Sequence, residues 1–554
     1  MSTLKNKPGA NGAAEILVHP AQGSTPAPCM LGCASGGDVR QWIGIVAQRG
    51  KLGLSNAQAY ARAWGLIAET NPFPSTLGRI CPHPCETACN RDAKDGAVAI
   101  NAMERFLGDW ALQFRLPLSR VEGAPAGASI GVVGAGPAGL SFAYQLARRG
   151  HRVTVYERRE QAGGMLRYGI PAFRLPKDIL QAEIDRIVAL GVDLKLNTAV
   201  GRDVSVDELR DTHDLLFLGI GAGSAARLGV PGEDGPGVVG GIEFLNAINR
   251  GEGYEQLSEV VVIGGGNTAI DAARTARRRG ADVSLLYRRT REEMPAIASE
   301  VDAALAEGVA IEFLAAPKAI RRDAIGPNAV MVQRMALGEP DASGRRRPVP
   351  VPGATFAVPA RLVIAAVSQN VDWSGLEPLE TGTRTGDVGA LGEGVLSGGD
   401  MLGLGIAGMA IAQGRQAAEA VHAKLSGAAR PAAPAAPARQ TSPARDVAAD
   451  FYPAQPPARV PEQPVAERIA QPDLEVHETL SEDAFVQEAE RCFSCGQCHG
   501  CQYCFMYCNG GGFVRLDETQ PGAYFALSLD RCLGCGKCIE LCPTGFLSSM
   551  EAAR

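Results

Sequence analysis

The 554-residue sequence lacks any apolar run of the ~18 residues that a membrane-spanning helix requires. Its first residues, MSTLKNKPGANGAAEILVHPAQ, contain no apolar stretch like the core of a signal peptide. Positive charge is not in excess either, because 54 Lys and Arg against 60 Asp and Glu leave a net charge of −6. Nucleic acid is therefore not an expected partner. We expect a cytoplasmic protein that is neither exported nor inserted in a membrane.

Cysteine is missing from the roughly 400 residues between Cys89 and Cys492, although the chain contains 15 cysteines. Five lie within residues 29–89 and ten within residues 492–542. Disulfides are disfavoured in a reducing compartment, and clustering at spacings of three and four residues is typical of metal or iron–sulfur ligation. The cysteines therefore predict metal centres at both ends of the chain.

The composition is that of a globular protein, with 46% hydrophobic and 21% charged residues. The length suggests three or four domains of about 150 residues. We predict a multidomain α/β protein with two Rossmann-like domains, divided as follows: a helical iron–sulfur domain (1–125), a flavin-type domain in two parts (126–240 and 346–426), a nicotinamide-type domain (241–345), a semi-extended Pro/Ala-rich linker (427–480) and a ferredoxin-like module (481–554).

The first nucleotide-binding pattern is ASIGVVGAGPAGLSFAYQLARRGHRVTVYER, a strand, a glycine turn, a helix and a second strand. Gly134 permits the tight turn, Gly136 lets the backbone approach a pyrophosphate, and Gly139 allows the helix to pack closely on the strand. Phosphate charge is received at the helix N-terminus, which includes Pro137 and Ala138. The second strand ends at Glu157, where a carboxylate suits the ribose hydroxyls of an adenosine.

The second pattern, VVVIGGGNTAIDAARTARRRGADVSLLYRRTREE, places Gly264, Gly266 and Ala269 at the three fingerprint positions. Its second strand ends at a tyrosine followed by Arg288 and Arg289. An acidic residue at this strand end would favour a nucleotide with a free 2′-hydroxyl. Arginine favours a 2′-phosphate instead, so NADP is preferred to NAD. The alternative is that these arginines belong to a charge-rich, solvated surface.

The cysteine run at the C-terminus carries the most specific motif of the chain, C-x2-C-x2-C-x3-C-P from Cys532 to Pro543. This spacing is typical of proteins with two [4Fe–4S] clusters, in which the fourth cysteine of each run reaches the neighbouring cluster. A zinc ribbon would need two separated pairs instead. The implied ligand sets are Cys498, Cys501, Cys504 and Cys542 for one cluster, and Cys532, Cys535, Cys538 and Cys508 for the other.

Residues 29–425 resemble the small-subunit-type flavoproteins of NADPH-dependent glutamate synthase. The resemblance is carried, in order, by ETNPFPSTLGRICPHPCETAC, GVVGAGPAGL, GGMLRYGIPAFRLPKDIL, VVIGGGNTAID, YRRTREEMPA and SGGD. The appended module is similar to a two-cluster ferredoxin. The same combination occurs in flavoprotein subunits that connect NAD(P)H to 2-oxoacid:ferredoxin oxidoreductases.

The resemblance implies FAD in the first unit and NADP(H) in the second, without a side-chain acid or base for hydride transfer. It assigns cofactor contacts to Gly164 and Arg174 of the long motif, to Asn267 and Thr268 of the second fingerprint, and to Asp400, which would hold the ribityl chain of the flavin. The flavin would accept the two electrons of a hydride and pass them on one at a time.

The resemblance also implies iron–sulfur clusters in the N-terminal domain, one of them on Cys33, Cys81 and Cys85 with Glu104 as fourth ligand. The CxxC expected shortly before Cys29 is absent. The segment EAERCFSC resembles the one that supplies this pair in relatives, so we predict that it folds back across the linker. The set would then be Cys29, Cys89, Cys492 and Cys495, giving four [4Fe–4S] clusters. The alternative is a single N-terminal cluster, with the pair at 492 and 495 free or substituting in the ferredoxin fold.

These patterns predict an enzyme, an NAD(P)H:ferredoxin-type oxidoreductase that passes electrons through FAD and [4Fe–4S] clusters to a ferredoxin or a partner subunit in a hetero-oligomeric complex. Such a partner could be a 2-oxoacid:ferredoxin oxidoreductase. The alternatives are the electron-input subunit of a glutamate synthase, against which the ferredoxin module counts, and a scaffold that only holds clusters, against which the two intact fingerprints count.

Overall fold

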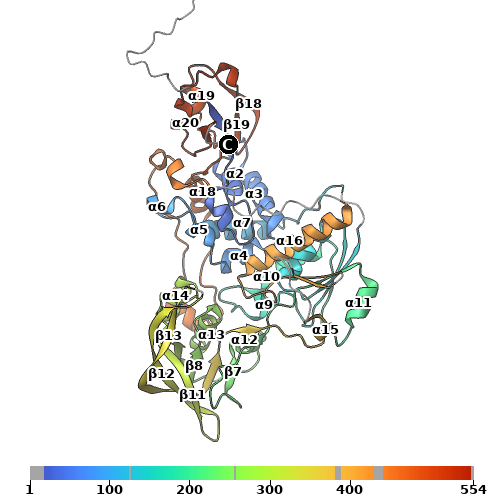
Figure 1. Cartoon of the computed structure of the whole chain (residues 1–554), viewed down its shortest axis with the longest axis vertical. Coiled ribbons are helices and arrows are strands. Elements are labelled where there is room, and N and C mark those ends of the chain that lie inside the picture. Colours follow the sequence, from blue (N-terminus) through green and yellow to red (C-terminus); the bar gives the residue numbers. More distant parts are fainter. Residues whose placement is uncertain are drawn as a thin grey trace, which may run out of the picture.

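A computed structural model describes residues 18–123, 127–254, 257–342, 344–380, 389–392, 394–427 and 441–550. The molecule is elongated, with the ferredoxin-like module at one end, the N-terminal helices in the middle and the two nucleotide-binding units side by side at the other end (Figure 1).

The first nucleotide-binding unit is built on a six-stranded sheet in the order β16-β17-β5-β2-β3-β4. All strands but β16 run parallel, and short apolar runs such as SIGVV form its buried centre. Helix α8 packs on the sheet and is itself covered by α16, which arrives from the far end of the unit. The elements are β2 (Ser129–Val133), α8 (Pro137–Ala147), β3 (Arg152–Tyr156), α9 (Met165–Tyr168), α10 (Lys177–Val188), β4 (Asp193–Lys195), α11 (Val206–Thr212), β5 (Leu215–Leu218), α15 (Glu377–Glu380), β16 (Gly389–Gly392), β17 (Val395–Ser397) and α16 (Ala407–Ser426).

The second unit has a five-stranded parallel sheet in the order β10-β9-β8-β14-β7, with an antiparallel sheet β11-β12-β13 beside it. A two-stranded ribbon, β6 with β15, connects the two units. The elements are β6 (Ser224–Ala225), β7 (Val238–Gly240), α12 (Gly241–Asn249), β8 (Glu259–Ile263), α13 (Asn267–Arg278), β9 (Asp282–Tyr287), α14 (Ala298–Ala306), β10 (Ala310–Phe313), β11 (Ala315–Arg322), β12 (Pro327–Pro340), β13 (Arg346–Pro359), β14 (Leu362–Ala365) and β15 (Gln369–Asn370).

The expected boundary at residue 345 is wrong, because β14 pairs with β8 in the centre of the nicotinamide-type sheet. The long strands β12 and β13 form an insertion between the βα units and the last central strand. This insertion separates β14 in sequence from the strand that it joins, so the fingerprint pattern does not indicate where the unit ends.

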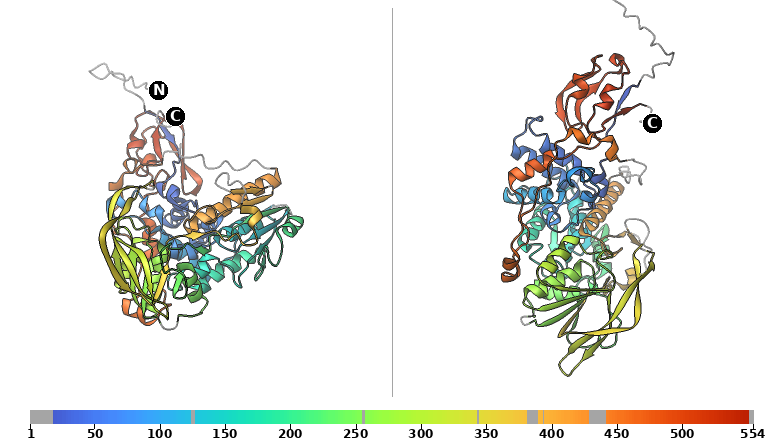
Figure 2. Two further views of the ribbon diagram at one scale, coloured as in Figure 1. Left: turned by 60° about the horizontal axis from the view of Figure 1, so that its bottom comes forward. Right: turned by 90° about the vertical axis from the view of Figure 1, so that its left-hand side faces the viewer.

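The N-terminal region is helical, as expected: α1 (Pro28–Gly32), α2 (Val39–Ala47), α3 (Asn56–Thr70), α4 (Pro74–Ile80), α5 (Pro84–Thr87), α6 (Asp92–Asp95) and α7 (Ile100–Gln113). A capping box in which Ser55 and Gln58 exchange hydrogen bonds starts α3. Ahead of these helices, β1 (Pro20–Gln22) pairs antiparallel with β20 near the C-terminus, so both ends of the described chain meet in the terminal module (Figure 2).

The C-terminal part contains η1 (Ala444–Asp446), η2 (Ala449–Phe451), α17 (Val465–Ala470), α18 (Glu482–Glu490), α19 (Tyr503–Met506), β18 (Phe513–Gln520), β19 (Ala523–Leu527), η3 (Leu529–Arg531), α20 (Lys537–Glu540) and β20 (Leu547–Ser549). Helix α18 packs against α2 and α7 of the N-terminal region. The segment that ends at Cys492 therefore lies on the N-terminal helices, where the fold-back prediction requires it.

The predicted semi-extended linker is wrong for residues 461–480, which form a strap across two domains. Glu475 accepts hydrogen bonds from Arg79 at 2.7 Å and pairs with Arg105 at 2.9 Å. The backbone N–H of Val476 donates to the Phe173 carbonyl at 3.0 Å. Composition predicts how a segment behaves without partners, whereas here arginines of other domains bind the backbone and the acidic side chains.

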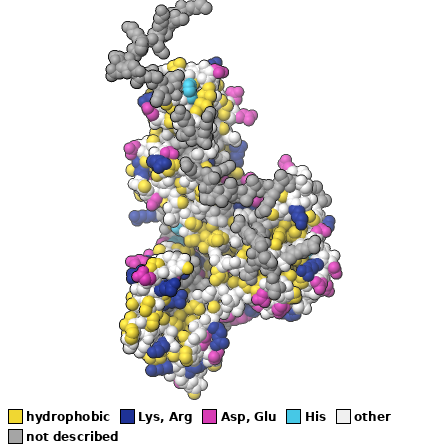
Figure 3. Space-filling model, in the orientation of Figure 1, with side chains coloured by type: hydrophobic (Ala, Val, Ile, Leu, Met, Phe, Trp, Pro, Cys, Tyr) yellow, Lys and Arg dark blue, Asp and Glu magenta, His cyan; other side chains and the backbone are white. Residues whose placement is uncertain are grey.

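None of the described helices is long and apolar enough to cross a membrane. On the face shown in Figure 3, acidic and basic side chains are interspersed over all the domains.

Candidate flavin, nicotinamide and iron–sulfur sites

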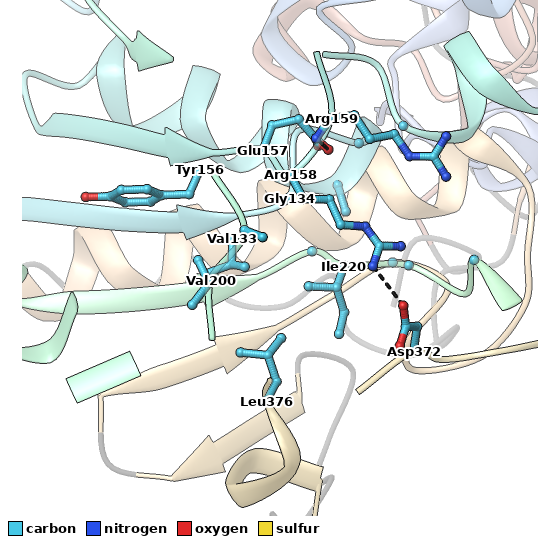
Figure 4. Close-up of a pocket in the computed structure, with 18 of the residues that line it drawn as sticks. Val133, Gly134, Tyr156, Glu157, Arg158, Arg159, Val200, Ile220, Asp372 and Leu376 are labelled. Atoms are coloured by element: carbon cyan, nitrogen blue, oxygen red, sulfur yellow. Dashed lines mark hydrogen bonds and ion pairs between the residues drawn. The ribbon is translucent and has the colours of Figure 1, made fainter. Parts of the chain in front are cut away.

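The first nucleotide-binding unit contains a cavity of about 530 Å³ at the carboxyl ends of its central strands (Figure 4). Ligands of open α/β sheets bind at this edge. The cavity is lined by seven of the predicted cofactor residues: Gly134, Gly136, Pro137, Ala138, Glu157, Gly164 and Asp400.

The fingerprint glycines of this unit stand where a side chain would collide or would block the cavity. Gly134 has φ +97°, and a Cβ there would lie 2.6 Å from the Gly219 carbonyl oxygen. A Cβ on Gly139 would lie 2.0 Å from the Gly134 oxygen, so this glycine lets α8 pack on β2 without itself lining the cavity. A Cβ on Gly136 would meet only the Gly219 oxygen, at 3.9 Å, which leaves space for a pyrophosphate.

Glu157 is 6% exposed, and backbone donors hold both oxygens of its carboxylate. Oε2 accepts from the Ala135 N–H at 2.8 Å, and Oε1 accepts from the Arg159 N–H at 2.9 Å. A carboxylate oxygen can accept more than one hydrogen bond, so each retains capacity for a hydroxyl. Both its orientation and its chemistry fit the ribose of an adenosine.

Asp400 also lines this cavity, from the loop between β17 and α16. Its Oδ1 accepts from the Gly405 N–H at 3.1 Å, and burial raises the pKa of its carboxyl. At the rim, Arg158 and Asp372 form an ion pair of 2.8 Å, shown by the dashed line in Figure 4. These residues fit FAD, with the polyhydroxylated chain next to a carboxylate.

The second unit contains a cavity of about 620 Å³, lined by Gly264, Gly266, Thr268, Arg288 and Arg289 among the predicted residues. A Cβ on Gly266 would meet nothing within 4 Å, so this glycine faces open space. Asn267 does not line the cavity; its side-chain oxygen accepts from the Ile297 N–H at 2.9 Å and holds the neighbouring loop. This cavity fits a nicotinamide dinucleotide that carries an additional phosphate.

The two predicted specificity arginines differ in their surroundings. Arg289 is 4% exposed, donates to the Arg346 carbonyl at 2.7 Å and pairs with Asp341 at 2.7 Å. Arg288 is exposed and makes no hydrogen bond or ion pair with the rest of the described chain. Of these two arginines, only Arg288 thus has its whole guanidinium free to bind a 2′-phosphate. Sequence reasoning missed Arg227 and Arg345, which also line the cavity; they lie outside the fingerprint, and no local pattern marks them.

Arg174, predicted to contact a cofactor, lines neither cavity. The residue is 8% exposed, and its guanidinium donates to Asp271 on α13 at 2.8 Å and lies 3.3 Å from Glu300. Arg174 therefore connects the loop after α9 in the first unit to the nicotinamide-type unit. Charged residues in a motif are ambiguous in this way, since sequence does not distinguish a ligand contact from a buried interdomain ion pair.

The N-terminal helices bring together the side chains of the first predicted cluster site: Cys33, Cys81, Cys85 and Glu104 line one cavity of about 30 Å³. Burial raises the pKa of Cys81 to about 12 and that of Glu104 to about 7. Glu104 accepts a hydrogen bond of 2.8 Å from the Asn71 amide, which orients the carboxylate. Thiols and a carboxyl that are buried together are ligands of the kind that a metal cluster needs.

The second site combines both ends of the chain: Cys29 and Cys89 from the N-terminal helices with Cys492 and Cys495. Burial raises the pKa of Cys29 well above its ordinary value, and the nearby thiols of the other three raise it further. The Asn90 amide donates to the Cys495 Sγ at 3.5 Å. Proximity of the four thiols supports the fold-back prediction.

The terminal module forms the third and fourth sites. Cys498, Cys501, Cys504 and Cys542 line one cavity of about 20 Å³. Burial raises the pKa of Cys538 to about 11, with further increases from Cys532, Cys508 and Cys535. Among the described residues, no three His, Cys, Asp or Glu side chains gather around the position of a single metal ion.

Together, the two cavities and the cysteine sites define a flavin- and iron–sulfur-containing pyridine-nucleotide oxidoreductase. Family models agree: residues 128–372 match pyridine nucleotide-disulphide oxidoreductases, residues 22–116 match dihydropyrimidine dehydrogenase domain II with its 4Fe-4S cluster, and residues 497–546 match the 4Fe-4S dicluster domain. FAD, NADP and [4Fe–4S] clusters are the cofactors of this class.

The Escherichia coli glutamate synthase [NADPH] small chain is 36% identical over 400 residues, which cover 67% of this chain and 84% of that protein. The chain belongs to the glutamate synthase small-chain family of flavoproteins. The Moorella thermoacetica NADP(+)-dependent formate dehydrogenase subunit beta is 40% identical over 448 residues, or 74% of this chain. The Geobacter sulfurreducens NADPH-Fe(3+) oxidoreductase subunit beta is 42% identical over 355 residues, or 63% of this chain. The chain spans 62% and 52% of these two longer relatives.

Proposed function

We propose that this chain transfers electrons between NADPH and an acceptor subunit or ferredoxin, through FAD and four [4Fe–4S] clusters held at the four sites described above. The flavin, when bound, exchanges a hydride with nicotinamide and single electrons with clusters. In this proposal the described residues bind, orient and shield the cofactors, and none of them acts as an acid or base in hydride transfer.

One observation carries the proposal: the first turn of α16 lines both the flavin cavity and the first cluster site. Ala410 lines the flavin cavity, and Gly408, two residues earlier, lines the cavity of Cys33, Cys81 and Cys85. A Cβ added to Gly408 would lie 3.1 Å from the Ala34 side chain, so the two domains are in close contact there. A flavin and a cluster held in these two cavities would both contact the first turn of α16, which would give electrons a short path between them.

The acceptor is proposed from the relatives and from the position of the fourth site. Relatives named as beta subunits and as a small chain support membership of a hetero-oligomeric complex. Cys535 is exposed. It belongs to the terminal module, which lies at the end of the molecule away from the nucleotide-binding units, where a partner can approach (Figure 1). A 2-oxoacid:ferredoxin oxidoreductase or a formate dehydrogenase would suit this position.

A second candidate is the electron-input subunit of a glutamate synthase, favoured by the 84% coverage of the small chain. In that case the module of residues 481–554 would be an addition to the input subunit. Purification of the native complex separates the two candidates, because the copurifying subunit would be a glutamine-dependent synthase in one case and a different oxidoreductase in the other.

The test is anaerobic viologen reduction by the isolated, cluster-loaded chain with NADPH or NADH as donor. Acid-released flavin should be FAD, and the wild type should reduce viologen. Cys33→Ala should still show bleaching of the flavin by NADPH but lose most viologen reduction, because the first cluster site is broken. A wild type with full flavin and iron that reduces no viologen with either nucleotide refutes the proposal.

A further inference from the structure

Residues 442–453, which belong to the Pro/Ala-rich segment, lie between the second and third cluster sites. The Asn90 amide that contacts Cys495 also donates to the Ser442 carbonyl at 2.9 Å. Farther along, the Ala448 N–H donates to the carbonyl of Pro543, next to Cys542, at 3.0 Å. We call this stretch the bridge segment; it contacts one cysteine loop at its start and the other in its middle.

Tyr452 of the bridge segment contacts an aromatic residue from each of the two cysteine loops. Its ring lies 4.5 Å from that of Phe493, which stands between Cys492 and Cys495. The centroid of its ring also lies 5.9 Å, edge to face, from that of His499, which stands between Cys498 and Cys501. Such ring contacts stabilise the packing of the two loops beyond simple burial.

Several contacts fix Tyr452 in this position. It is 7% exposed, and its hydroxyl donates to the Phe493 carbonyl at 2.7 Å. Arg91 donates to the carbonyl of Pro453, the next residue, at 2.9 Å and lies over the Phe493 ring at 5.0 Å. Burial raises the pKa of Tyr452, and thiols of both cluster sites raise it further, so its phenol remains neutral and protonated.

On this geometry, and resting on the proposed electron-transfer function, we propose that Tyr452 is a positioning residue that sets the passage of electrons between the second and third cluster sites. Its ring excludes water from the space between the two loops and holds them at a fixed separation. One electron passes, so that the donor site is oxidised by one electron and the acceptor site is reduced by one. Tyr452 is outside the residues matched by the family models.

Water exclusion also has a consequence for reduction potentials. Reducing a tetra-cysteinyl cluster adds negative charge to an anionic centre, and nearby water stabilises that charge. Removing the Tyr452 ring should therefore raise the midpoint potential of the second or third cluster, or of both. A purely structural residue would not shift a potential while leaving iron content unchanged.

The test compares Tyr452→Leu, which removes the ring, with Tyr452→Phe, which removes only the hydroxyl, in the full, cluster-loaded chain. Tyr144→Leu is the matched control, because Tyr144 is also buried and donates to a backbone carbonyl, that of Ala68 at 2.8 Å, but lies in α8. Rapid-freeze EPR after mixing with NADPH follows each cluster. Tyr452→Leu should slow reduction of the terminal module about tenfold or more, with the flavin and first cluster unaffected. Tyr452→Phe and the control should resemble wild type.

Redox titration should show the raised potential in Tyr452→Leu alone. If Tyr452→Leu loses iron, His499→Leu removes the other end of the contact and should show the same selective slowing. Wild-type transfer rates and potentials in an iron-replete Tyr452→Leu, or in His499→Leu, overturn the inference. Photoreduced deazaflavin, which feeds electrons in at the exposed fourth site, keeps this test independent of NADPH. A wild type that exchanges electrons between sites under light but not with NADPH contradicts the proposed function alone.

Discussion

Replacing Arg288 with alanine should weaken NADPH binding without changing the use of NADH. Arg288 is exposed at the nicotinamide-type cavity and forms no ion pair with other described residues, so its guanidinium is free to bind a 2′-phosphate. A hydrogen bond to a charged group contributes about 1.5–3 kcal/mol, which corresponds to roughly a 10- to 150-fold rise in KM for NADPH. NADH lacks the phosphate, so its KM should remain near the wild-type value. Steady-state viologen reduction with each nucleotide measures both constants.

Two further variants show whether the effect belongs to Arg288. Arg321→Ala removes an exposed arginine of β11 that does not line the cavity, and should leave both constants unchanged. Arg289→Ala should mainly lower thermal stability, because it leaves Asp341 without this partner and frees the Arg346 carbonyl. An unchanged KM for NADPH in Arg288→Ala, or a wild type that already prefers NADH, would show that this arginine is only a solvated surface residue.

Three other predictions test the iron–sulfur sites and the domain contacts. Replacing Cys492 and Cys495 with alanine should lower iron from about sixteen to about twelve per chain; an iron content of about twelve in the wild type would instead support a single N-terminal cluster. Burial alone would raise the pKa of Asp109, but hydrogen bonding to Arg79 outweighs it and lowers the pKa. The Asp109 carboxylate therefore stabilises the fold fully above its unfolded pKa of about 3.9 and loses this effect as pH falls; Asp109→Asn should be less stable than wild type at neutral pH and show a smaller loss on acidification, measured by melting temperature. Arg174→Leu should lower the free energy of unfolding, measured by chemical denaturation, by about 3–5 kcal/mol, because it leaves the buried carboxylate of Asp271 without this partner. FAD content should stay normal. Loss of FAD with unchanged stability would show instead that Arg174 contacts the flavin.

Local sequence was sufficient for the two nucleotide-binding turns and the cysteine runs of the terminal module. Gly134 takes the positive φ of its turn, and Gly139 lies against the Gly134 oxygen within the same βαβ unit, so their spacing along the chain specifies the geometry. Cysteines separated by two residues likewise reach one cluster from a single loop. Such features depend on neighbours only a few residues away, and a pattern can therefore specify them.

Tertiary structure alone decided the features that depend on contacts between distant segments. The fourth-ligand position of Glu104 and the second cluster site were suggested by resemblance, but only packing of α18 on the N-terminal helices brings Cys492 and Cys495 to Cys29. Arg288 and Arg289 are adjacent in sequence and equivalent in charge, yet a hairpin some 50 residues away pairs with one and not with the other.

The strap and the bridge segment show the same limit most clearly. Their proline- and alanine-rich composition predicts an extended spacer, because composition indicates only how a segment behaves without contacts to the rest of the chain. The folded chain binds them through Arg79, Arg91 and Arg105, which stand more than 300 residues earlier in the sequence. Sequence by itself thus determined which cofactors the chain can hold, whereas long-range ion pairs and hydrogen bonds decided how its sites are placed relative to one another.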